Sequence, residues 1–572
     1  MLKRWHQFQE FLNWFFQVVK RYWSSSEKWK AIAILSFLIV CIVASNNLFV
    51  AFSGIQNSLL SHLTEKKVSE FQQDLINIAK MGVVIITVLV LRNYVQNKLV
   101  LYWRNWLTLD FLANYFRDRN FYKININKSI DNPDQRIADD INSFVESTLK
   151  FTLDFGDTLL GGILFLGVLW SLGSFLVWVA IASATVQTLI SFFLGRVLIP
   201  LNFQNLERQA NFRYGLVHIR NNSESIAFYQ GEEQEMNLVS DRFKKVMLTL
   251  HQIVLPDSSL KAFTVLLGYI SSLIPILALA PMFFNGKIAY GDITQAGIAF
   301  ASVSSVFTWF ANSFQELTGF AAVIKRLGTF QSALEKSQNS SKISQINYQT
   351  SDHLALSNVV VVTPDFKKVL VENLSLNVPT TQGLLIMGPS GVGKSSLLRA
   401  IAGLWNNGSG EILRPKLEET MFLPQRPYMI LGSLRAQLLY PHTSREINNE
   451  AIQIALEKVN LGDLIERVGG LETELNWIDV LSLGEQQRLG FARLLLNKPH
   501  YVILDEATSA LDVDNEKLVY ELLKSFQINY ISVAHRPTVI PYHRYLLKLL
   551  GQGQWKLVNT SPVKPAFLTK NF

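Results

Sequence analysis

The chain has 572 residues, of which 49% are hydrophobic and only 17% carry a formal charge. This length allows about two to four domains, and the composition argues against a disordered chain, a collagen, a coiled coil and a simple soluble enzyme. The single cysteine, Cys41, excludes an intramolecular disulfide framework and a cysteine-rich zinc site. The formal net charge of +8 is compatible with either nucleic acid or anionic lipid as a partner, and the positions of the basic residues must decide between them.

Long stretches without a formal charge occupy much of the first half of the chain. A helix needs ~20 mostly apolar residues to cross ~30 Å of hydrocarbon, so these stretches predict membrane spans. The uncharged run Thr158–Gly195 is too long for one crossing, and the turn Ser171–Ser174 divides it into two spans. We predict six spans in all, the other four being Ala31–Phe52, Ile76–Val95, Ala262–Gly286 and Ile293–Gln315.

The second predicted span is the weakest, because Lys80 and Arg92 lie within it. Charged side chains inside a span either reach toward the membrane surface or face a cavity between helices. Together with Gln187 and Gln295 they are candidates for a polar cavity, whose basic residues would suit an anionic or amphipathic solute. Snorkelling and hydrogen bonding between helices explain the same residues equally well.

Basic residues are unevenly distributed between the predicted loops. Residues 1–30 carry six Lys and Arg against two acids, Arg92–Lys150 carries nine and Arg196–Lys261 carries eight. The loops after the first and fifth spans hold only Lys66, Lys67 and Lys287. Because basic loops stay in the cytosol, both termini are expected there. This asymmetry accounts for much of the net charge, so nucleic acid is not expected as a partner, and no cleavable signal peptide is evident.

The two long basic loops mix polar and apolar residues at helical spacing, as in Trp103–Arg119 and Glu207–Gln230, which predicts membrane helices that continue into the cytosol. Beyond the polar run Lys336–Gln349, short β-rich runs alternate with helical segments, the pattern of an α/β nucleotide-binding domain with a largely parallel sheet. These runs are Val359–Thr363, Leu384–Met387, Tyr501–Leu504 and Tyr530–Val533. We therefore expect a cytosolic segment at 1–30, an all-α membrane domain at 31–335, a linker at 336–350 and a nucleotide-binding domain at 351–572.

The run GPSGVGKS, which begins at Gly388, matches the phosphate-binding pattern G-x-x-x-x-G-K-[ST] between an apolar strand and a helical run. Glycines let backbone amides turn toward phosphates, and the following helix presents its positive end. Lys394 adds a charge that bridges the terminal phosphates, and Ser395 offers a hydroxyl to Mg²⁺. The residues expected to contact nucleotide here are Gly388, Pro389, Ser390, Gly391, Val392, Gly393, Lys394, Ser395 and Ser396.

Two acidic residues follow the apolar run YVIL, which begins at Tyr501. Asp505 and Glu506 would lie at the carboxyl edge of a buried strand, beside the phosphates in this fold class. Asp505 would hold Mg²⁺, commonly through water, and Glu506 would polarise the attacking water as general base. Acids after strands also serve as helix caps, so these two residues alone are weak evidence for catalysis. Because a P-loop precedes them in the chain, the catalytic interpretation is favoured.

The segment VLSLGEQQR places Ser482 and Gly484 at the start of a helix, where a hydroxyl, free amides and the helix dipole can face an anion. Within one domain this site lies far along the chain from the P-loop. Its expected target is therefore the nucleotide bound by a second copy of the chain.

The segments GPSGVGKSS, LPQRP, LSLGE, ILDE, SALD and SVAHRP, in this order, closely resemble those of ATP-binding-cassette (ABC) transporters. Six spans before one cassette resemble a half-transporter. The resemblance implies an exporter-type membrane domain, a P-loop NTPase domain, ATP and Mg²⁺ as cofactors, and ATP hydrolysis coupled to transport.

The resemblance also implies roles for individual residues. Gln425 would contact Mg²⁺ and the attacking water, His535 would hydrogen-bond the γ-phosphate and orient Glu506, and Asp512 would couple two sites across a dimer. A lone histidine is more often a satisfied surface residue, but His535 follows the strand YISVA. The expected catalytic residues are Lys394, Gln425, Glu506 and His535, and the expected Mg²⁺ ligands are Ser395, Gln425 and Asp505.

Membrane-domain segments, among them Asn132–Ile141 and Ser223–Glu235, resemble the peroxisomal D subfamily and the bacterial SbmA/BacA-like and YddA-like proteins. The second segment would couple the membrane domain to the cassette, although by itself it is a plain polar helix. Two residues depart from the ABC pattern. Leu483 replaces a glycine of the signature, as in the YddA-like pattern, and Thr363 occupies the position of the aromatic residue that usually stacks on adenine, so Phe366 is an alternative.

One P-loop and one signature segment cannot complete a site within one cassette, so we expect a homodimer related by a twofold axis. The resemblance implies as solute a cobalamin-like corrinoid, a peptide or another hydrophilic compound, or acyl-CoA in the peroxisomal branch. We expect a multi-pass protein of a bacterial inner membrane. A nucleotide-gated regulator without transport is the alternative function, and the complete set of hydrolytic residues disfavours it.

Overall fold

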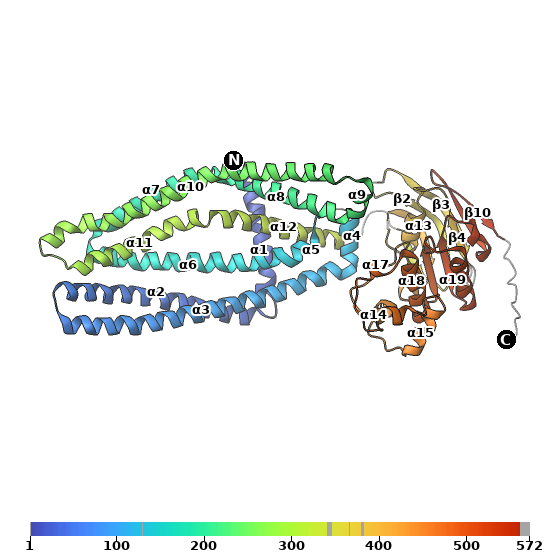
Figure 1. Ribbon diagram of the computed structural model, residues 1–572, viewed down its shortest axis with the longest axis horizontal. Helices are drawn as coiled ribbons and strands as arrows, with labels where there is room; N and C mark the ends of the chain where they lie inside the picture. Colours follow the sequence, from blue (N-terminus) through green and yellow to red (C-terminus); the bar gives the residue numbers. More distant parts are fainter. Residues whose placement is uncertain are drawn as a thin grey trace. The chain divides into compact units, whose positions relative to one another are not determined.

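The computed structural model describes residues 2–127, 130–339, 346–364, 366–378, 383–405 and 407–560. The chain divides into two compact units, Met1–Asn339 and Ser340–Phe572. The first unit is helical and the second combines helices with strands, as Figure 1 shows.

The first unit consists of long helices joined by short connections. They are α1 (Leu2–Trp23), α2 (Lys28–Thr64), α3 (Val68–Phe116), η1 (Arg117–Arg119), α4 (Asn120–Asn127), α5 (Pro133–Gln135), the π-helical turn η2 (Arg136–Asp140), α6 (Ile141–Leu172), α7 (Ser174–Gly195), α8 (Leu198–Asn221), α9 (Ser223–Tyr229), α10 (Glu232–Phe284), α11 (Tyr290–Asn312) and α12 (Phe314–Asn339).

The six predicted spans fall on six separate helices, α2, α3, α6, α7, α10 and α11. The predicted division of the long uncharged run is confirmed, because α6 ends at Leu172 and α7 begins at Ser174. Among the described residues, four helical stretches are long and apolar enough to cross a membrane, and Ser174–Ile190 is a shorter apolar helix. In hydrocarbon a helix satisfies every backbone polar group internally, which is why these sequences fold as uninterrupted helices.

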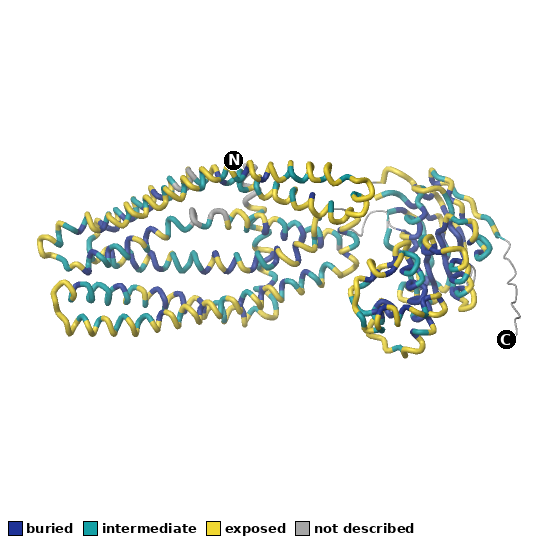
Figure 2. The backbone as a smooth tube through the Cα atoms, in the orientation of Figure 1, coloured by how far each residue is buried: buried dark blue, intermediate teal, exposed yellow. Residues whose placement is uncertain are grey.

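Both segments that sequence spacing identified are helical, but only the first continues a predicted span without interruption, because α7 ends at Gly195 and α8 begins at Leu198. Trp103–Arg119 begins inside α3, whose 49 residues span ~74 Å, more than twice the thickness of the hydrocarbon. Glu207–Gln230 forms the end of α8 together with α9. Helix α10 is longer still, with 53 residues and three internal prolines. Many residues of α8 and α10 are exposed, as the colours of Figure 2 show.

The predicted N-terminal segment includes a helix that sequence reasoning did not identify. Helix α1 packs against α12, and Tyr22 stacks on Trp103 of α3 with ring centroids 5.5 Å apart. Gly328 of α12 makes the close approach possible, because a Cβ atom there would lie 2.3 Å from Cγ of Trp14. The start of the chain is thus part of the membrane-domain core.

The second unit contains two sheets and short helices. Its strands are β1 (Asn347–Thr350), β2 (Leu354–Val362), β3 (Val369–Val378), β4 (Leu384–Met387), β5 (Gly408–Arg414), β6 (Thr420–Leu423), β7 (Tyr501–Asp505), β8 (Asn529–Val533), β9 (Tyr545–Gly551) and β10 (Gln554–Asn559). Its helices are α13 (Lys394–Ile401), η3 (Leu417–Glu419), α14 (Leu434–Leu439), α15 (Asn449–Glu457), α16 (Leu464–Arg467), α17 (Trp477–Val480), α18 (Leu483–Asn497), α19 (Val513–Ser525) and η4 (Pro537–Tyr542).

The six-stranded sheet has the order β10-β9-β4-β8-β7-β6, and all neighbours except β10 and β9 are parallel. The predicted largely parallel sheet is therefore confirmed. Alternate residues of its central strands enter two different cores. On β7, Tyr501 and Ile503 pack on one face, while Val502 and Leu504 pack on the other. Burial on both faces explains the uninterrupted apolar run before Asp505.

The predicted linker at 336–350 differs from the structure at both ends. Helix α12 continues through Asn339, and Asn347–Thr350 forms β1, which pairs in parallel with β5. Residues 340–345 lie outside the described part of the chain. Polar composition alone did not reveal β1, because this edge strand is mostly exposed and lacks an apolar run.

Candidate nucleotide site

The phosphate-binding loop lies between β4 and α13, at the carboxyl edge of the parallel sheet. Gly391 and Gly393 have φ angles of +79° and +107°, which side chains other than glycine rarely tolerate. A Cβ atom on Gly393 would also lie 2.9 Å from Cβ of Leu370. The loop therefore turns at glycines into the first turn of α13, where free amides and the helix dipole favour an anion.

Lys394 folds back over this loop. Its Nζ donates hydrogen bonds of 2.9 Å to the carbonyl oxygens of Gly388 and Pro389. Burial lowers the pKa of Lys394, and the nearby carboxylates of Glu506 and Asp505 oppose that shift. The ammonium thus lies against the loop that is expected to carry the phosphates.

Ser395 and Asp505 provide oxygen ligands of the kind that Mg²⁺ prefers. The Ser395 hydroxyl donates a hydrogen bond of 3.2 Å to Oδ1 of Asp505, at the end of β7. Burial raises the pKa of Asp505, which a bound cation would counteract. Within the described residues, no cluster of three or more His, Cys, Asp or Glu side chains could hold a metal by itself. Such a small set fits Mg²⁺, which keeps waters and substrate phosphates among its ligands.

Glu506 contacts two of the other predicted catalytic side chains, Gln425 and His535. Gln425 Nε2 donates a hydrogen bond of 3.0 Å to one carboxylate oxygen, Oε2, and His535 Nε2 lies 3.0 Å from the other, Oε1. Glu506 has a φ angle of +53°, in the left-handed region that non-glycine residues rarely adopt. Its amide donates to the carbonyl of Val533 on β8, which fixes this conformation. Such backbone strain is concentrated at functional sites.

The signature segment begins helix α18 with a reciprocal cap. Ser482 Oγ accepts from the Glu485 amide, and the Glu485 carboxylate accepts from the Ser482 amide at 2.9 Å. Gly484 lies so close to the carbonyl of Ala510 that a Cβ atom would be 3.1 Å from its oxygen. Leu483, the departure from the ABC pattern, is half-buried in the first turn. Ser482 and Gly484 therefore stand at the start of a helix, as the sequence predicted.

Asp512 caps helix α19, with its side chain accepting a bond of 2.7 Å from the amide of Asn515. This bond holds the pKa of Asp512 below its ordinary value. Thr363 bonds with Lys368 and so lies at the turn between β2 and β3, and Phe366 in the same turn has a ring that is 54% exposed. An exposed ring is available for stacking.

Sequence reasoning missed Gln487, which is 1% exposed and connects three motifs. Its amide nitrogen donates to the Gln425 carbonyl at 2.8 Å and to the Ser509 hydroxyl at 3.2 Å. Its amide oxygen accepts from the Ala510 amide at 3.0 Å. The only signal in the sequence is its place one helical turn after Gly484, which alone does not distinguish it from a surface residue.

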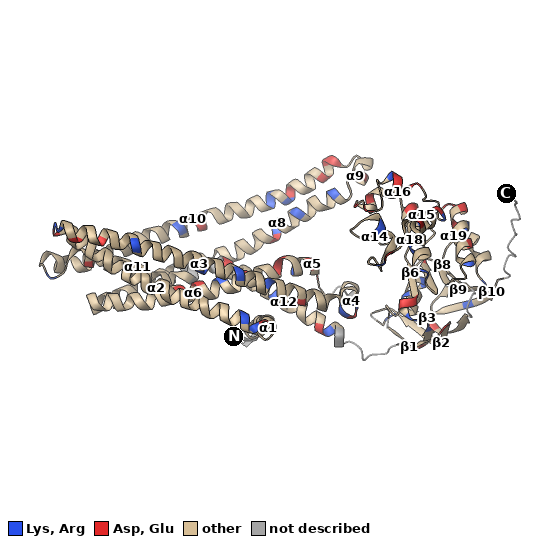
Figure 3. Ribbon diagram, turned by 90° about the horizontal axis from the view of Figure 1, so that it is seen from below, with Lys and Arg blue, Asp and Glu red and all other residues tan. Residues whose placement is uncertain are grey.

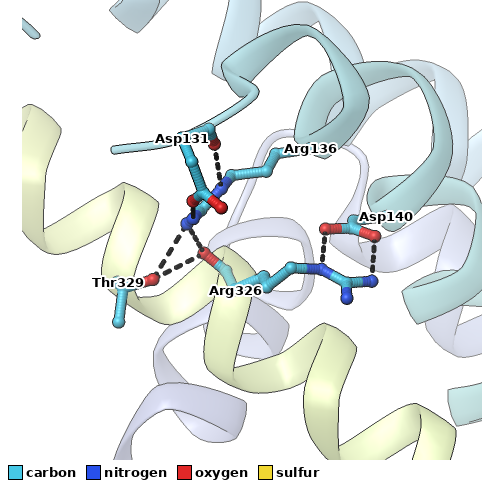
Figure 4. Close-up of polar contacts among 5 residues, drawn as sticks. All are labelled: Asp131, Arg136, Asp140, Arg326 and Thr329. Atoms are coloured by element: carbon cyan, nitrogen blue, oxygen red, sulfur yellow. Dashed lines mark hydrogen bonds and ion pairs between the residues drawn. The ribbon is translucent and has the colours of Figure 1, made fainter. Parts of the chain in front are cut away.

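The segment Asn132–Ile141, singled out by its resemblance, is held to α12 by two arginines (Figure 4). Arg136 donates to the Arg326 carbonyl at 2.5 Å and to the Thr329 hydroxyl at 2.9 Å, and it pairs with Asp131. Arg326 in turn pairs with Asp140 through two bonds of 2.6 and 2.7 Å. The π-helical turn η2 is thereby fastened to α12, the last helix of the first unit.

The other singled-out segment, Ser223–Glu235, forms α9 and the first turn of α10. The rings of Phe228 and Tyr229 are 80% and 86% exposed. Figure 3 shows charged residues along the halves of α8 and α10 that lead to α9. This end of the helix pair therefore combines charged residues with two exposed aromatic residues.

The four candidate cavity residues have specific partners or places. Arg92 pairs with Asp157 of α6 at 2.8 Å, Gln187 bonds to Ser271 of α10, and Gln295 accepts from Asn57 of α2 at 2.7 Å. Lys80 lies exposed on α3. Three of the four therefore join one helix to another.

An ATP-binding cassette is defined by the P-loop, the carboxylate pair after β7 and a separate capped signature helix. This cassette follows a membrane domain in the same chain. Comparisons with known proteins agree. Residues 19–284 match the family described as ABC transporter transmembrane region 2, and residues 371–509 match the family described as ABC transporter.

Among similar proteins, an uncharacterized ABC transporter ATP-binding protein of Synechocystis is 42% identical, over 93% of this chain and 82% of that protein. The chloroplastic ABC transporter D family member 2 of Arabidopsis thaliana is 37% identical, over 94% and 85%. A mouse lysosomal cobalamin transporter is 30% identical, over 92% and 93%. The chain belongs to the ABC transporter family, as a half-transporter whose ATPase is coupled to transport and whose helices form a multi-pass membrane domain.

A solved bacterial Atm1-family ABC exporter with ATP bound shares the fold, with a TM-score of 0.72, coverage of 91% of this chain and 94% of that chain, and 16% sequence identity. The predicted exporter-type helical domain followed by an α/β cassette is confirmed.

Proposed function

We propose that two copies of this chain pair head to tail and bind two ATP molecules between them. Each nucleotide contacts Gly388–Ser396 of one cassette and Ser482–Gly484 of the other. One cassette holds only one copy of each surface, which supports a dimer with a twofold axis. ATP binds the closed pair better than the open pair, so it shifts the membrane domain toward one conformation until hydrolysis removes the preference.

The observation that carries the proposed hydrolytic mechanism is the arrangement around Glu506. Its carboxylate accepts the proton of the attacking water as general base, while Gln425 and His535 fix its two oxygens. Lys394 stabilises charge on the terminal phosphate. Ser395, Asp505 and Gln425 would hold Mg²⁺, which would help to neutralise the developing charge. Asp512 and Gly484 connect this centre to the second cassette.

The solute is a bulky hydrophilic or amphipathic compound, with a corrinoid or a peptide as the first candidates and acyl-CoA as the alternative. A mouse relative is named a cobalamin transporter, which supports the first class. The protein spans a bacterial inner membrane and has both termini in the cytosol. The basic residues of the loops between spans support this topology.

The test is Glu506→Gln in the full-length protein reconstituted in nanodiscs. Loss of the general base lowers the rate of ATP hydrolysis by ~10²- to 10⁴-fold while ATP binding persists and traps paired cassettes. Glu521→Gln, on the exposed face of α19, is the matched control and keeps wild-type turnover. Wild-type hydrolysis by the Glu506 variant contradicts the assignment. Robust ATPase without uptake of any solute into proteoliposomes favours a nucleotide-gated regulator.

A further inference from the structure

A pocket of about 400 Å³ lies among α2, α3, α6 and α11 within the membrane domain. One of its walls is a stripe of α2, where Ser45, Phe49, Ser53 and Gln56 recur at helical spacing. The walls thus combine aromatic rings with hydroxyl and amide groups. This volume lies near the lower end of ligand pockets, so it suits a part of a bulky solute rather than the whole.

The charged group that lines this pocket is an acid, Asp157 of α6. Its Oδ1 accepts a hydrogen bond of 2.6 Å from Asn46 Nδ2, and its Oδ2 accepts one of 2.8 Å from Arg92 Nη1. Arg92 stands behind the acid and is not among the lining residues, so its guanidinium is engaged by Asp157 instead of facing the pocket. Asp154, one turn earlier on α6, is a second carboxylate within electrostatic reach of Arg92. The carboxylates therefore outnumber this arginine.

An ion pair in a membrane span is costly in hydrocarbon and faces a cavity or another protein group. The Asp157 side chain is 33% exposed and the Arg92 side chain 10% exposed, so it is the acid that reaches the open space. Each carboxylate oxygen can accept two hydrogen bonds, and Asn46 and Arg92 donate one bond to each oxygen. Asp157 therefore keeps the capacity to accept bonds from a ligand.

Gly161 sets the position of Asn46 relative to this acid. A Cβ atom at Gly161 would lie 2.7 Å from Oδ1 of Asn46, so only a glycine lets the amide reach Asp157. Asn46 is also tied to the Ile42 carbonyl of its own helix at 3.0 Å. The acid is thus held rigidly by two donors from different helices, as a preorganised binding group should be.

We infer that this pocket is a subsite for an amphipathic cation, in which Asp157 accepts hydrogen bonds from a protonated amine while Phe49 and Phe165 contact the apolar body. The inference rests on the proposed transport function and deepens it by naming a chemical group of the solute. It also reverses the expectation of an anionic solute that the basic residues of the second span suggested.

The test compares solutes that differ only in their head group. Dansylcadaverine carries a primary amine, and its N-acetyl derivative is neutral with the same body. Binding to the full-length protein in phosphatidylcholine nanodiscs is measured by fluorescence anisotropy. The amine is expected to bind about tenfold more tightly than the acetylated form, because the charged bond to Asp157 is lost on acetylation. Equal affinities overturn the inference.

Asp157→Asn is expected to reduce amine binding about tenfold and to leave binding of the acetylated form unchanged. Asp110→Asn is the matched control, since it removes another ion pair with an arginine, Arg21 at 2.6 Å, away from the pocket. An unchanged preference for the amine in the Asp157 variant overturns the inference.

A second measurement does not depend on the folding of the Asp157 variant. In a chain with Cys41→Ala and Ser305→Cys, the new thiol lies on the pocket wall, and the amine is expected to slow its reaction with a maleimide while the acetylated form does not. Equal reaction rates with both compounds overturn the inference.

The amine could come from a soluble compound or from the headgroup of phosphatidylethanolamine. Competition by that lipid in mixed nanodiscs identifies a lipid source, and unchanged binding identifies a soluble one; either result keeps the amine chemistry. ATP hydrolysis is measured in the same samples. If the wild-type protein hydrolyses ATP but shows no preference for the amine, the subsite alone is overturned. If the wild-type protein does not hydrolyse ATP, the proposed function is overturned.

Discussion

His535 Nε2 lies 3.0 Å from Oε1 of Glu506. Glu506 directly follows β7, and His535 stands two residues beyond the end of β8. The other oxygen of the same carboxylate accepts from Gln425. Two donors from two different loops therefore fix the plane of the carboxylate. Orientation of a general base in this way contributes to the rate of the reaction.

His535→Ala is expected to lower kcat for ATP hydrolysis by about tenfold to a hundredfold, because the Glu506 carboxylate loses one of its two orienting donors. The KM for ATP is expected to change little. Steady-state phosphate release separates the two parameters. His535→Gln, which offers an amide donor, should retain more activity than His535→Ala; equal rates for both variants would show that the donor is not what matters.

The buried residue His543 predicts a dependence of stability on pH. Burial lowers the pKa of His543 to about 4 from 6.5, while its bond to the Val539 carbonyl opposes the shift. Its other nitrogen lies 2.8 Å from the Ser532 hydroxyl, so the neutral ring satisfies both partners. In the unfolded chain the ring takes up a proton below pH 6.5, whereas in the folded chain it does so only near pH 4.

The free energy of unfolding is therefore expected to fall by about 3 kcal/mol as the pH is lowered from 6.5 to 4, and this contribution is fully present above 6.5. Thermal unfolding followed by tryptophan fluorescence across this window measures it. His543→Gln, whose amide can replace both hydrogen bonds, should flatten the slope. An unchanged slope in that variant would assign the acid sensitivity to other groups.

The pair of Arg326 and Asp140 predicts a loss of stability in the membrane domain. The Asp140 side chain is 3% exposed and accepts both of its bonds from Arg326. Arg326→Gln leaves this carboxylate without its counter-charge, at a cost of about 2 kcal/mol. A lower midpoint of thermal unfolding in detergent checks this. Lys244→Gln removes an exposed pair with Asp241 and should leave the midpoint unchanged.

Gly328→Ala is expected to weaken the docking of α1 on α12, because the added methyl group would meet Cγ of Trp14 at 2.3 Å. Overpacking of this kind costs about 1–3 kcal/mol. Trp14→Leu in the same chain should restore much of the loss by making room for the methyl group. The effect is measured by the protease sensitivity of the N-terminal helix and by the midpoint of thermal unfolding. If the second substitution restores neither, contact with Trp14 is not the cause of the loss.

Much of the fold and of the candidate site could be predicted from the sequence, because the signals are local. The helices that carry the six predicted spans could be located from charge and hydropathy alone, and the break between α6 and α7 could be located from the turn at Ser171–Ser174. The P-loop and Asp505 were placed because phosphate chemistry needs a glycine-rich turn and acids directly after buried strands. In each case the determining residues are neighbours in the chain.

What could not be predicted depends on contacts between residues far apart in the sequence. Gln487 joins three motifs only after α18 has packed beside the sheet, and the left-handed backbone of Glu506 follows from its bond to Val533. The partner of Arg92 could not be predicted for the same reason, because Asp157 lies 65 residues later in the chain.

The length of α3 amplifies small rotations of the helix. A rod of 49 residues extends ~74 Å, so a rotation of about 5° around a pivot at one end displaces the other end by ~6 Å. Helix α10 is a longer arm, and its three prolines weaken the backbone at defined points where it could bend. In each of these helices a slight tilt at one end becomes a larger displacement at the other.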